Sequence, residues 1–226
     1  MLWAASMMKG YAVSGIDGKL GTVTDLLFDD TNWKMRWLVV STGNWFPDHD
    51  VLLPVAALGY PNPERHQFGV TLTVREIRDS PHVEGDLPVS RQAEIDAPPH
   101  HAATAPRTGY TVLAMSKPND PHLRSVDAVI GHRVHAIDGL IGHVDDFLIH
   151  DADWRIRFIK VDTRNWGPAR RVLLPPRLVR TIDWPTRAVH LDVDRRVIEN
   201  RSPHDPPSGG DDELFLACND IRWVKE

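Results

Sequence analysis

Apolar and polar residues alternate along several short stretches of the chain, which is the period of a β-strand. Residues 20–28 and 69–74 follow this alternation, and residues 51–53 form a shorter apolar stretch. Residues 34–42 carry apolar side chains at both alternating sets of positions. The pattern predicts that this last strand is buried on both sides, under a neighbouring segment, a terminal helix or another chain.

Turn signals separate these stretches. Asp17-Gly18 follows the short strand predicted for residues 10–16, and the polar residues 29–32 follow the strand at 20–28. Glycine adopts positive φ at low cost, so an Asp-Gly pair is typical of a tight turn. Together the signals predict a small, mainly β unit of five or six short strands.

The same pattern occurs twice. Residues 10–54 align with residues 131–175 without a gap at a constant offset of 121, and 21 of the 45 aligned positions are identical. In both copies an aromatic strand is followed by Thr-x-Asn-Trp-x-Pro and then by Val-Leu-Leu-Pro. We interpret this as an internal duplication of a whole domain, because two copies joined by a linker do not make a stacked repeat array.

The composition between and after the copies sets the predicted boundaries. We expect domain 1 at residues 1–95, a Pro/Ala/His-rich linker at 96–121 and domain 2 at 122–201. Residues 88–95 are compatible with a brief helix. Residues 202–226 begin as a Pro-, Gly- and Asp-rich mobile segment, and we expect residues 213–226 to fold back as a short helix or strand.

The composition says more about the cellular compartment of the protein than about its function. The formal net charge of −5 gives no general electrostatic case for nucleic acid or an anionic membrane. Cys218 is the single cysteine, so no disulfide forms within the chain and a reducing compartment is expected. We find neither a signal peptide nor an apolar run of roughly 18 residues. The expectation is a soluble, cytoplasmic protein with no membrane insertion.

A longer motif, Gly-x-x-Val-x-x-x-Asp-Gly-x-x-Gly, opens each copy at Gly10 and Gly131. This motif, the aromatic strand and the Val-Leu-Leu-Pro segment resemble the PRC-barrel family over residues 2–80 and 123–200. The resemblance implies an all-β fold with two small barrels in tandem, related by a pseudo-two-fold axis, and with short helical turns.

The resemblance also implies a task. Members of the family occur in the cytoplasmic part of the photosynthetic reaction-centre H subunit, in a ribosome maturation factor and in stand-alone bacterial proteins, and they act mainly by binding macromolecules. The family has no common catalytic residue set that could be transferred to positions here. We therefore expect no catalytic residue, no cofactor and no metal ligand here.

Three aspartates recur at equivalent positions of the two copies. The pairs are Asp17 with Asp138, Asp25 with Asp146 and Asp30 with Asp151. Paired carboxylates could perform acid–base chemistry, and an enzyme that uses them is the alternative function. We interpret the first pair as the start of Asp-Gly turns and the others as residues at strand ends. The glycines of residues 15–21 belong to a turn rather than a phosphate loop, because a strand follows them instead of a helix.

Histidine and tryptophan offer further candidates. Twelve histidines include His100 and His101 in the linker and others within residues 143–153, but they lack the short ligand spacing on a rigid frame that zinc sites use. A metal-dependent enzyme therefore stays an alternative only. Four tryptophans, at positions 33, 45, 154 and 166, could stack on bases or sugars; we assign them to packing and loop anchoring.

One charge difference between the copies is the best functional clue. Residues 164–180 contain five arginines and no acid, whereas the equivalent residues 43–59 contain two aspartates and no Lys or Arg. The residues are Arg164, Arg170, Arg171, Arg177 and Arg180 in the second copy, and Asp48 and Asp50 in the first. Three explanations stay open: neutral variation of a solvated loop, docking of one barrel on another within or between chains, and binding of an acidic or phosphate-bearing partner.

The sequence thus predicts a non-enzymatic adaptor that acts through protein–protein contacts, with inter-barrel docking or a homodimer as one form of contact. Five arginines without interleaved aromatic residues are too few to predict nucleic-acid binding. A ribosome- or RNA-processing-associated protein is a further alternative, which the resemblance permits.

Overall fold

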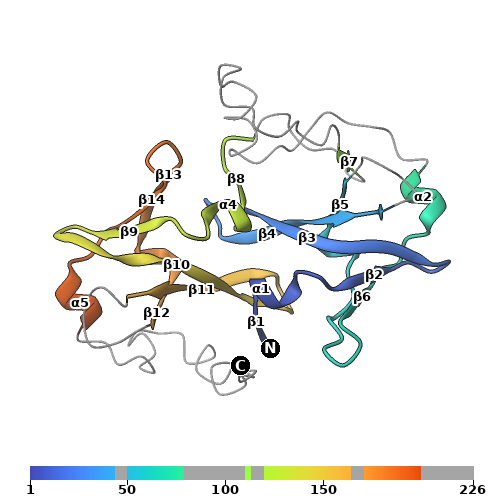
Figure 1. Ribbon diagram of the computed structural model, residues 1–226, viewed down its shortest axis with the longest axis horizontal. Coiled ribbons are helices and arrows are strands. Elements are labelled where there is room, and N and C mark those ends of the chain that lie inside the picture. Colours follow the sequence, from blue (N-terminus) through green and yellow to red (C-terminus); the bar gives the residue numbers. More distant parts are fainter. Residues whose placement is uncertain (44–49, 79–109, 113–119, 164–170, 200–226) are drawn as a thin grey trace. The chain divides into compact units, whose positions relative to one another are not determined.

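The structure is a computed structural model that describes residues 1–43, 50–78, 110–112, 120–163 and 171–199. Strands dominate these residues, and the helices are short (Figure 1). The predicted fold class, mainly β with short helical turns, is confirmed.

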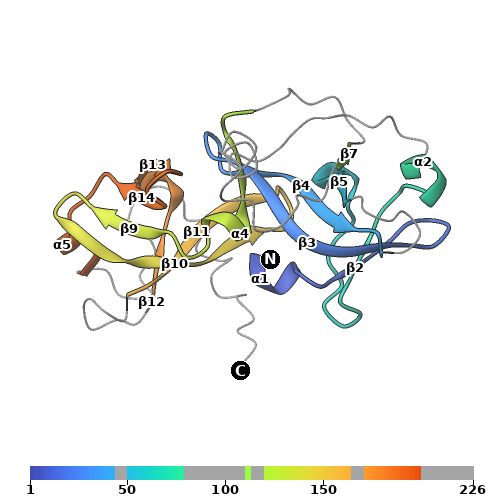
Figure 2. The same cartoon turned by 45° about the horizontal axis from the view of Figure 1, so that its top comes forward.

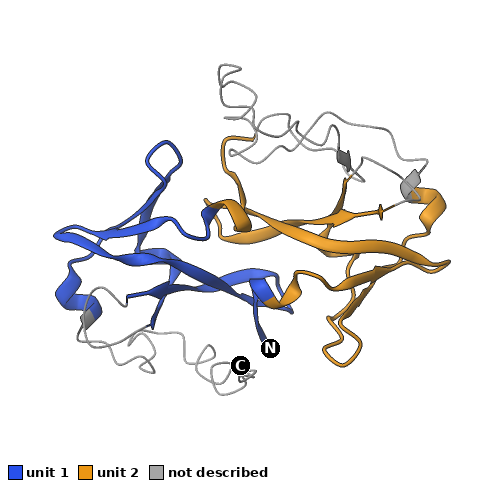
Figure 3. Ribbon diagram, in the orientation of Figure 1, with its two compact units in different colours: residues 1–6, 129–226 blue, residues 7–128 orange. Residues whose placement is uncertain are grey.

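The chain divides into two compact units, and the division is not the one predicted (Figure 3). Unit 1 consists of residues 1–6 and 129–226, and unit 2 consists of residues 7–128. The chain therefore leaves unit 1 within helix α1 (Ala5–Met8) and returns to it within helix α4 (Val126–Val129). Each unit is described on its own below.

Unit 2 contains the first copy of the repeat. Its strands are β2 (Ala12–Ser14), β3 (Lys19–Asp29), β4 (Lys34–Ser41), β5 (Asp50–Pro54), β6 (Gln67–Gly69), β7 (Tyr110–Val112) and β8 (Leu123–Ser125). Strands β2 to β5 pair antiparallel in sequence order, while β6 runs parallel to β2 and β7 parallel to β5. The 3₁₀ helix η2 (Val55–Ala57) and helix α2 (Val74–Arg78) complete the unit.

Unit 1 contains the second copy. Its strands are β1 (Leu2–Ala4), β9 (Arg133–Ala136), β10 (Gly139–His150), β11 (Arg155–Asp162), β12 (Arg171–Leu174), β13 (Val179–Asp183) and β14 (Ala188–Leu191). Strands β9 to β12 pair antiparallel in order, and β14 runs parallel to β9 and antiparallel to β13. The short helices are η4 (Pro176–Leu178) and α5 (Arg195–Glu199).

The repeat offset is visible in the elements themselves. Strands β4 and β11, helices η2 and η4, and helices α2 and α5 begin at positions that differ by 121. Two elements break the correspondence among the described residues: β13 has no counterpart strand in unit 2, and β7 has none in unit 1.

Each unit is completed by a strand that precedes the other copy in the sequence. Strand β1, at the start of the chain, pairs antiparallel with β10 of unit 1, with Leu2 opposite His150. Strand β8, just before the second copy, pairs antiparallel with β3 of unit 2, with Leu123 opposite Asp29 (Figures 1 and 2). We call β1 and β8 the exchanged strands. The predicted boundaries assigned both to the copy that follows them, because chain order cannot show which sheet edge a three-residue strand joins.

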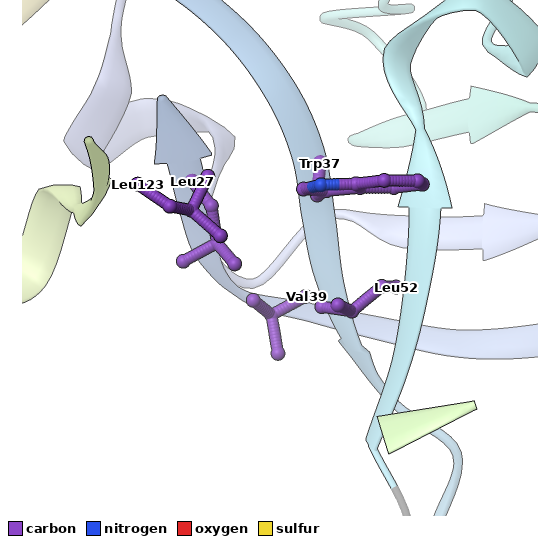
Figure 4. Packing of buried hydrophobic residues seen from close by; sticks show 5 residues of the cluster. All are labelled: Leu27, Trp37, Val39, Leu52 and Leu123. Carbon is purple, nitrogen blue, oxygen red and sulfur yellow. The ribbon is translucent and has the colours of Figure 1, made fainter. Parts of the chain in front are cut away.

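The exchanged strand also explains why β4 is buried on both sides, as its sequence predicts. Of its residues, Leu38 is fully buried and Val39 on the other face is 4% exposed. The second face packs in a cluster that includes residues of three neighbouring strands (Figure 4). The cluster consists of Leu27, Trp37, Val39, Leu52 and Leu123. Leu123 comes from β8, so the exchanged strand contributes to the cover of this face.

The prediction of a strand at residues 69–74 is wrong in its position. Strand β6 ends at Gly69, and helix α2 begins at Val74. Thr73 and Glu76 form a capping box: the Thr73 Oγ1 accepts from the Glu76 N–H at 3.1 Å, and the Glu76 carboxylate accepts from the Thr73 N–H at 2.7 Å. That Thr-x-x-Glu signal outweighs the alternation. The helix predicted at residues 88–95 lies outside the described residues.

The last glycine of the opening motif allows two strands to approach closely. A Cβ atom on Gly21 would collide with the carbonyl oxygen of Ser41 in the neighbouring strand β4. Gly142 stands in the same relation to Asp162 of β11. Glycine is therefore required at these two positions by backbone packing.

Candidate functional site

The repeated aspartates bind the exchanged strands. Asp25 lies at a register shift in β3, where it faces the end of β8. Its Oδ2 accepts a hydrogen bond from the Ser125 hydroxyl at 2.5 Å, and its Oδ1 accepts from the Asp127 N–H at 3.2 Å. Burial, opposed by the Ser125 hydrogen bond and supported by the nearby Asp127 charge, raises the pKa of Asp25 to about 6.

Asp146 makes the equivalent contacts in unit 1. It is 4% exposed and lies at the matching register shift of β10. The Ser6 hydroxyl donates to its Oδ2 at 2.5 Å, and the Ser6 N–H donates to its Oδ1 at 3.2 Å. Ser6 follows β1 as Asp127 follows β8, so the same carboxylate holds the same backbone position of each exchanged segment.

Asp30 and Asp151 hold the other end of each exchanged strand. In unit 2, Asp30 accepts hydrogen bonds from the Arg124 Nε at 2.5 Å and lies 2.9 Å from the His122 Nδ1. In unit 1, Asp151 accepts from the amino group of Met1 at 2.7 Å and from the Trp3 Nε1 at 3.1 Å. The partners differ chemically, but they stand at matching positions: Trp3 and Arg124 lie in β1 and β8, and Met1 and His122 directly precede these strands.

The third pair joins a hairpin to a helix. Asp17 Oδ1 accepts from the Val74 N–H at 2.7 Å, and Asp138 Oδ1 accepts from the Arg195 N–H at 2.8 Å. The hydrogen bond from Arg195 holds the pKa of Asp138 below its usual range. All six repeated aspartates thus accept hydrogen bonds from nearby chain segments, and in this arrangement they act as structural acceptors.

Three of the predicted arginines lie within the described residues, and we call them the arginine edge: Arg171, Arg177 and Arg180. Arg171 begins β12 with its side chain 54% exposed, and its Nε lies 3.5 Å from the Asp145 Oδ2. Arg177 in η4 and Arg180 in β13 are exposed. Within the described part of the chain, neither of these two has an ion-pair partner.

The first copy carries different chemistry at the matching positions. Asp50, Ala56 and Gly59 stand where the second copy has the arginine edge. Asp50 is only 9% exposed at the start of β5, so it does not belong to an exposed acidic surface. Asp48, Arg164 and Arg170 lie outside the described residues.

The described histidines make pairwise contacts. The His135 and His190 rings stack with their centroids 5.6 Å apart, and the His150 Nδ1 lies 3.3 Å from Asp153. Burial and the neighbouring His190 and Arg133 charges lower the pKa of His135. Where the structure describes the chain, no group of three or more His, Cys, Asp or Glu residues is placed to hold a metal ion. His100 and His101 fall outside that part.

The tryptophans that the structure describes pack inward. Trp33 stacks on Phe28 with ring centroids 5.6 Å apart, and Trp154 is 8% exposed. Both have positive φ, 57° and 58°, directly before the strand that follows them. Trp45 and Trp166 are outside the described ranges. Trp33 and Trp154 therefore pack within the fold, as predicted.

Comparison with known proteins agrees with this geometry for the first copy. The family model of the PRC-barrel domain matches residues 4–75. The chain thus has one match to the PRC-barrel domain, at residues 4–75, and is mainly β. A search of curated proteins gave no match. None of the helices in the described ranges has the length and apolar character needed to cross a membrane.

Proposed function

We propose that the chain is a non-enzymatic adaptor built from two PRC-barrel-like domains, the second formed by residues of the second copy. The 21 identical positions of 45 support this extension of the family to the second copy. So does the recurrence of β4, η2 and α2 as β11, η4 and α5 at the offset of 121.

The observation that carries the proposal is the arginine edge. Arg177 and Arg180 expose two positive charges where the first copy has Ala56 and Gly59 on the same scaffold. Guanidinium groups bind carboxylates with paired hydrogen bonds, and arginine is enriched in protein interfaces. The favoured partner is therefore a protein that presents acidic side chains, either another chain or a second copy.

The alternatives lack a comparable observation. The carboxylates that an acid–base enzyme would use accept hydrogen bonds from Ser125, Ser6 and other residues that complete the fold. An association with ribosomal components rests on family membership alone. The adaptor function therefore remains the one that the surface supports best.

The test is affinity capture from native cells with quantitative mass spectrometry. Reversal of two charges in Arg177→Glu/Arg180→Glu should reduce capture of the partner by about tenfold or more, and the wild-type signal should weaken as salt increases. Arg196→Glu, an exposed arginine of α5 in the same unit, is the matched control. Equal recovery of the same proteins by the double variant and the control would exclude the arginine edge as the binding surface.

A further inference from the structure

Among the described residues, strand β12 of unit 1 is paired along one edge, whereas its counterpart in unit 2 is paired along both. In unit 2, β5 pairs with β4 on one side and, in parallel, with β7 on the other, with Asp50 opposite Tyr110 and Leu52 opposite Val112. In unit 1, β12 pairs with β11, and the described residues supply no strand for its other side. An open edge leaves a row of backbone donors and acceptors free to pair with an added strand.

Burial shows the same difference. Leu52 in β5 is fully buried, whereas the equivalent Leu173 in β12 is only partly buried. The neighbouring Val172 and Leu174 are buried at 7% and 1% exposure, so β12 itself is firmly part of the sheet. The edge is therefore formed and apolar, and one more strand would finish covering it.

We propose that residues 213–217, Glu-Leu-Phe-Leu-Ala, add to this edge as a strand parallel to β12. In unit 2 the covering strand β7 comes from the segment that follows the first copy, after helix α2. The segment that follows the second copy begins after helix α5 at residue 200, and its longest apolar run is residues 214–218. Residues 213–217 would thus cover β12 of unit 1 as β7 covers β5 of unit 2.

Charge and length both suit this occupant. Asp211, Asp212 and Glu213 precede the apolar run, and a parallel register like that of β5 and β7 brings them beside Arg171 at the start of β12. In unit 2 the acid Asp50 begins the strand instead. The 14 residues from Glu199 to Glu213 span about 46 Å when extended, more than the diameter of roughly 35 Å expected for a domain of this size.

Cys218, the single cysteine, allows a direct test in the full chain. A nitroxide attached to Cys218 should broaden the backbone amide signals of Val172, Leu173 and Leu174 in the NMR spectrum. It should leave those of Val51 and Leu53 in β5 sharp, and reduction of the nitroxide should restore the broadened signals. No selective broadening at β12 would overturn the proposal.

A mixed sample separates this chain from a second copy. Isotope-labelled chains without nitroxide are combined with unlabelled chains that carry it. Sharp β12 signals in the mixture confirm that each tail binds its own chain. Broadened signals in the mixture would overturn the proposal in favour of exchange between two copies.

Amide hydrogen exchange tests the strand pairing itself. Phe215→Pro removes a backbone donor from the middle of the added strand, so the amides of β12 should exchange at least about tenfold faster. Val224→Pro is the control in the same tail and should change nothing at β12. Arg171→Glu should also speed exchange, and addition of Glu213→Arg should restore it. Equal exchange in the wild type and Phe215→Pro would contradict the proposal. None of these readouts depends on the external partner.

Discussion

The two units share residues that make contacts within each unit, and they differ in a residue at the start of β5 and β12. Gly21 and Asp25 of unit 2 recur as Gly142 and Asp146 of unit 1, and these residues permit the close approach of two strands or bind an exchanged segment. By contrast, Asp50 is replaced by the exposed Arg171. These internal contacts are therefore kept in both copies, whereas the first residue of β5 and β12 differs in charge and in exposure.

The exchanged strands show how little sequence such a contact requires. At the first and third positions of the matched segments, Met1 and Trp3 bind Asp151 as His122 and Arg124 bind Asp30. An amino group, an indole, an imidazole and a guanidinium can all serve as the donor. The acceptor is fixed and the donor varies, which is why the aspartates are the repeated residues.

The largest expected effect tests the exchange itself. Leu123 is fully buried in the cluster around Trp37, so Leu123→Ala should cost about 2–5 kcal/mol of unfolding free energy. Urea unfolding measures the loss of unfolding free energy, and hydrogen exchange shows which strands lose protection. The amides of β3 and β4, which belong to unit 2, should lose protection. Loss confined to β10 and β11 would contradict the exchange.

Leu2→Ala is the matched change in unit 1. Leu2 is 6% exposed and packs with Leu148 and Phe158. The free-energy loss should be smaller than for Leu123→Ala, and protection should fall in β10 rather than in β3. Leu140→Ala, at a residue 46% exposed, is the control and should stay within about 0.5 kcal/mol of the wild type.

The motif glycines provide the next test. Gly21→Ala and Gly142→Ala each place a methyl group against a backbone carbonyl oxygen of the adjacent strand, and we expect each to cost about 1–3 kcal/mol or more. Thermal unfolding of the two single variants measures the loss. Gly69→Ala is the control, because a Cβ there has no neighbour within 4 Å. A neutral result at Gly21 would mean that β3 and β4 can separate without cost.

Much of the fold could be predicted from the sequence, because each copy contains strong local signals. Alternation placed β3 and β4, and the Asp-Gly turn placed the hairpin before β3. The double-faced apolar pattern of residues 34–42 also predicted a covering segment. Which segment covers this face could not be predicted, since β8 has only three residues and pairs with a strand about 100 positions away.

The candidate site was predictable only in outline. The charge difference identified Arg171, Arg177 and Arg180, and the structure leaves all three exposed. The same charge difference identified Asp50, yet this residue is buried at the start of a strand that pairs with β7. Its burial depends on a segment about 60 positions further along the chain, so local composition carried no sign of it.

Asp25 gives unit 2 a dependence on pH. Its folded pKa of about 6 lies above the ordinary aspartate value of 3.8, so between these pH values the folded state binds more protons than the unfolded state. Stability from this group is therefore present at low pH and is lost as the pH rises through about 6. The loss should be on the order of 2 kcal/mol.

Urea unfolding from pH 4 to pH 7 measures this contribution as the difference between the wild type and Asp25→Asn. The variant should lack the decline, because its amide does not titrate. Asp127→Asn removes the nearby negative charge that raises the pKa of Asp25, and it should flatten the decline in part. Parallel curves for the wild type and Asp25→Asn would contradict the buried carboxylic acid.

The smallest expected effect concerns the face of unit 1 beside strand β12. Asp145 Oδ2 lies 2.8 Å from the Lys160 Nζ and 3.5 Å from the Arg171 Nε. In unit 2 the residues equivalent to Asp145 and Lys160 are Thr24 and the buried Val39. The ion pair is thus particular to unit 1, because Thr24 and Val39 carry no charge. Because it is partly exposed, Asp145→Ala should cost less than about 1 kcal/mol.

Unfolding at low and high salt decides whether this face is open to solvent. The loss caused by Asp145→Ala should shrink at high salt, because exposed ion pairs are screened. Thr24→Ala, the matched change in unit 2, removes a hydrogen bond to the Val39 carbonyl oxygen at 3.3 Å and should not depend on salt. A salt-independent loss above about 2 kcal/mol at Asp145 would show a pair shielded from water. In that case the face of unit 1 would be as fully covered as the face of unit 2.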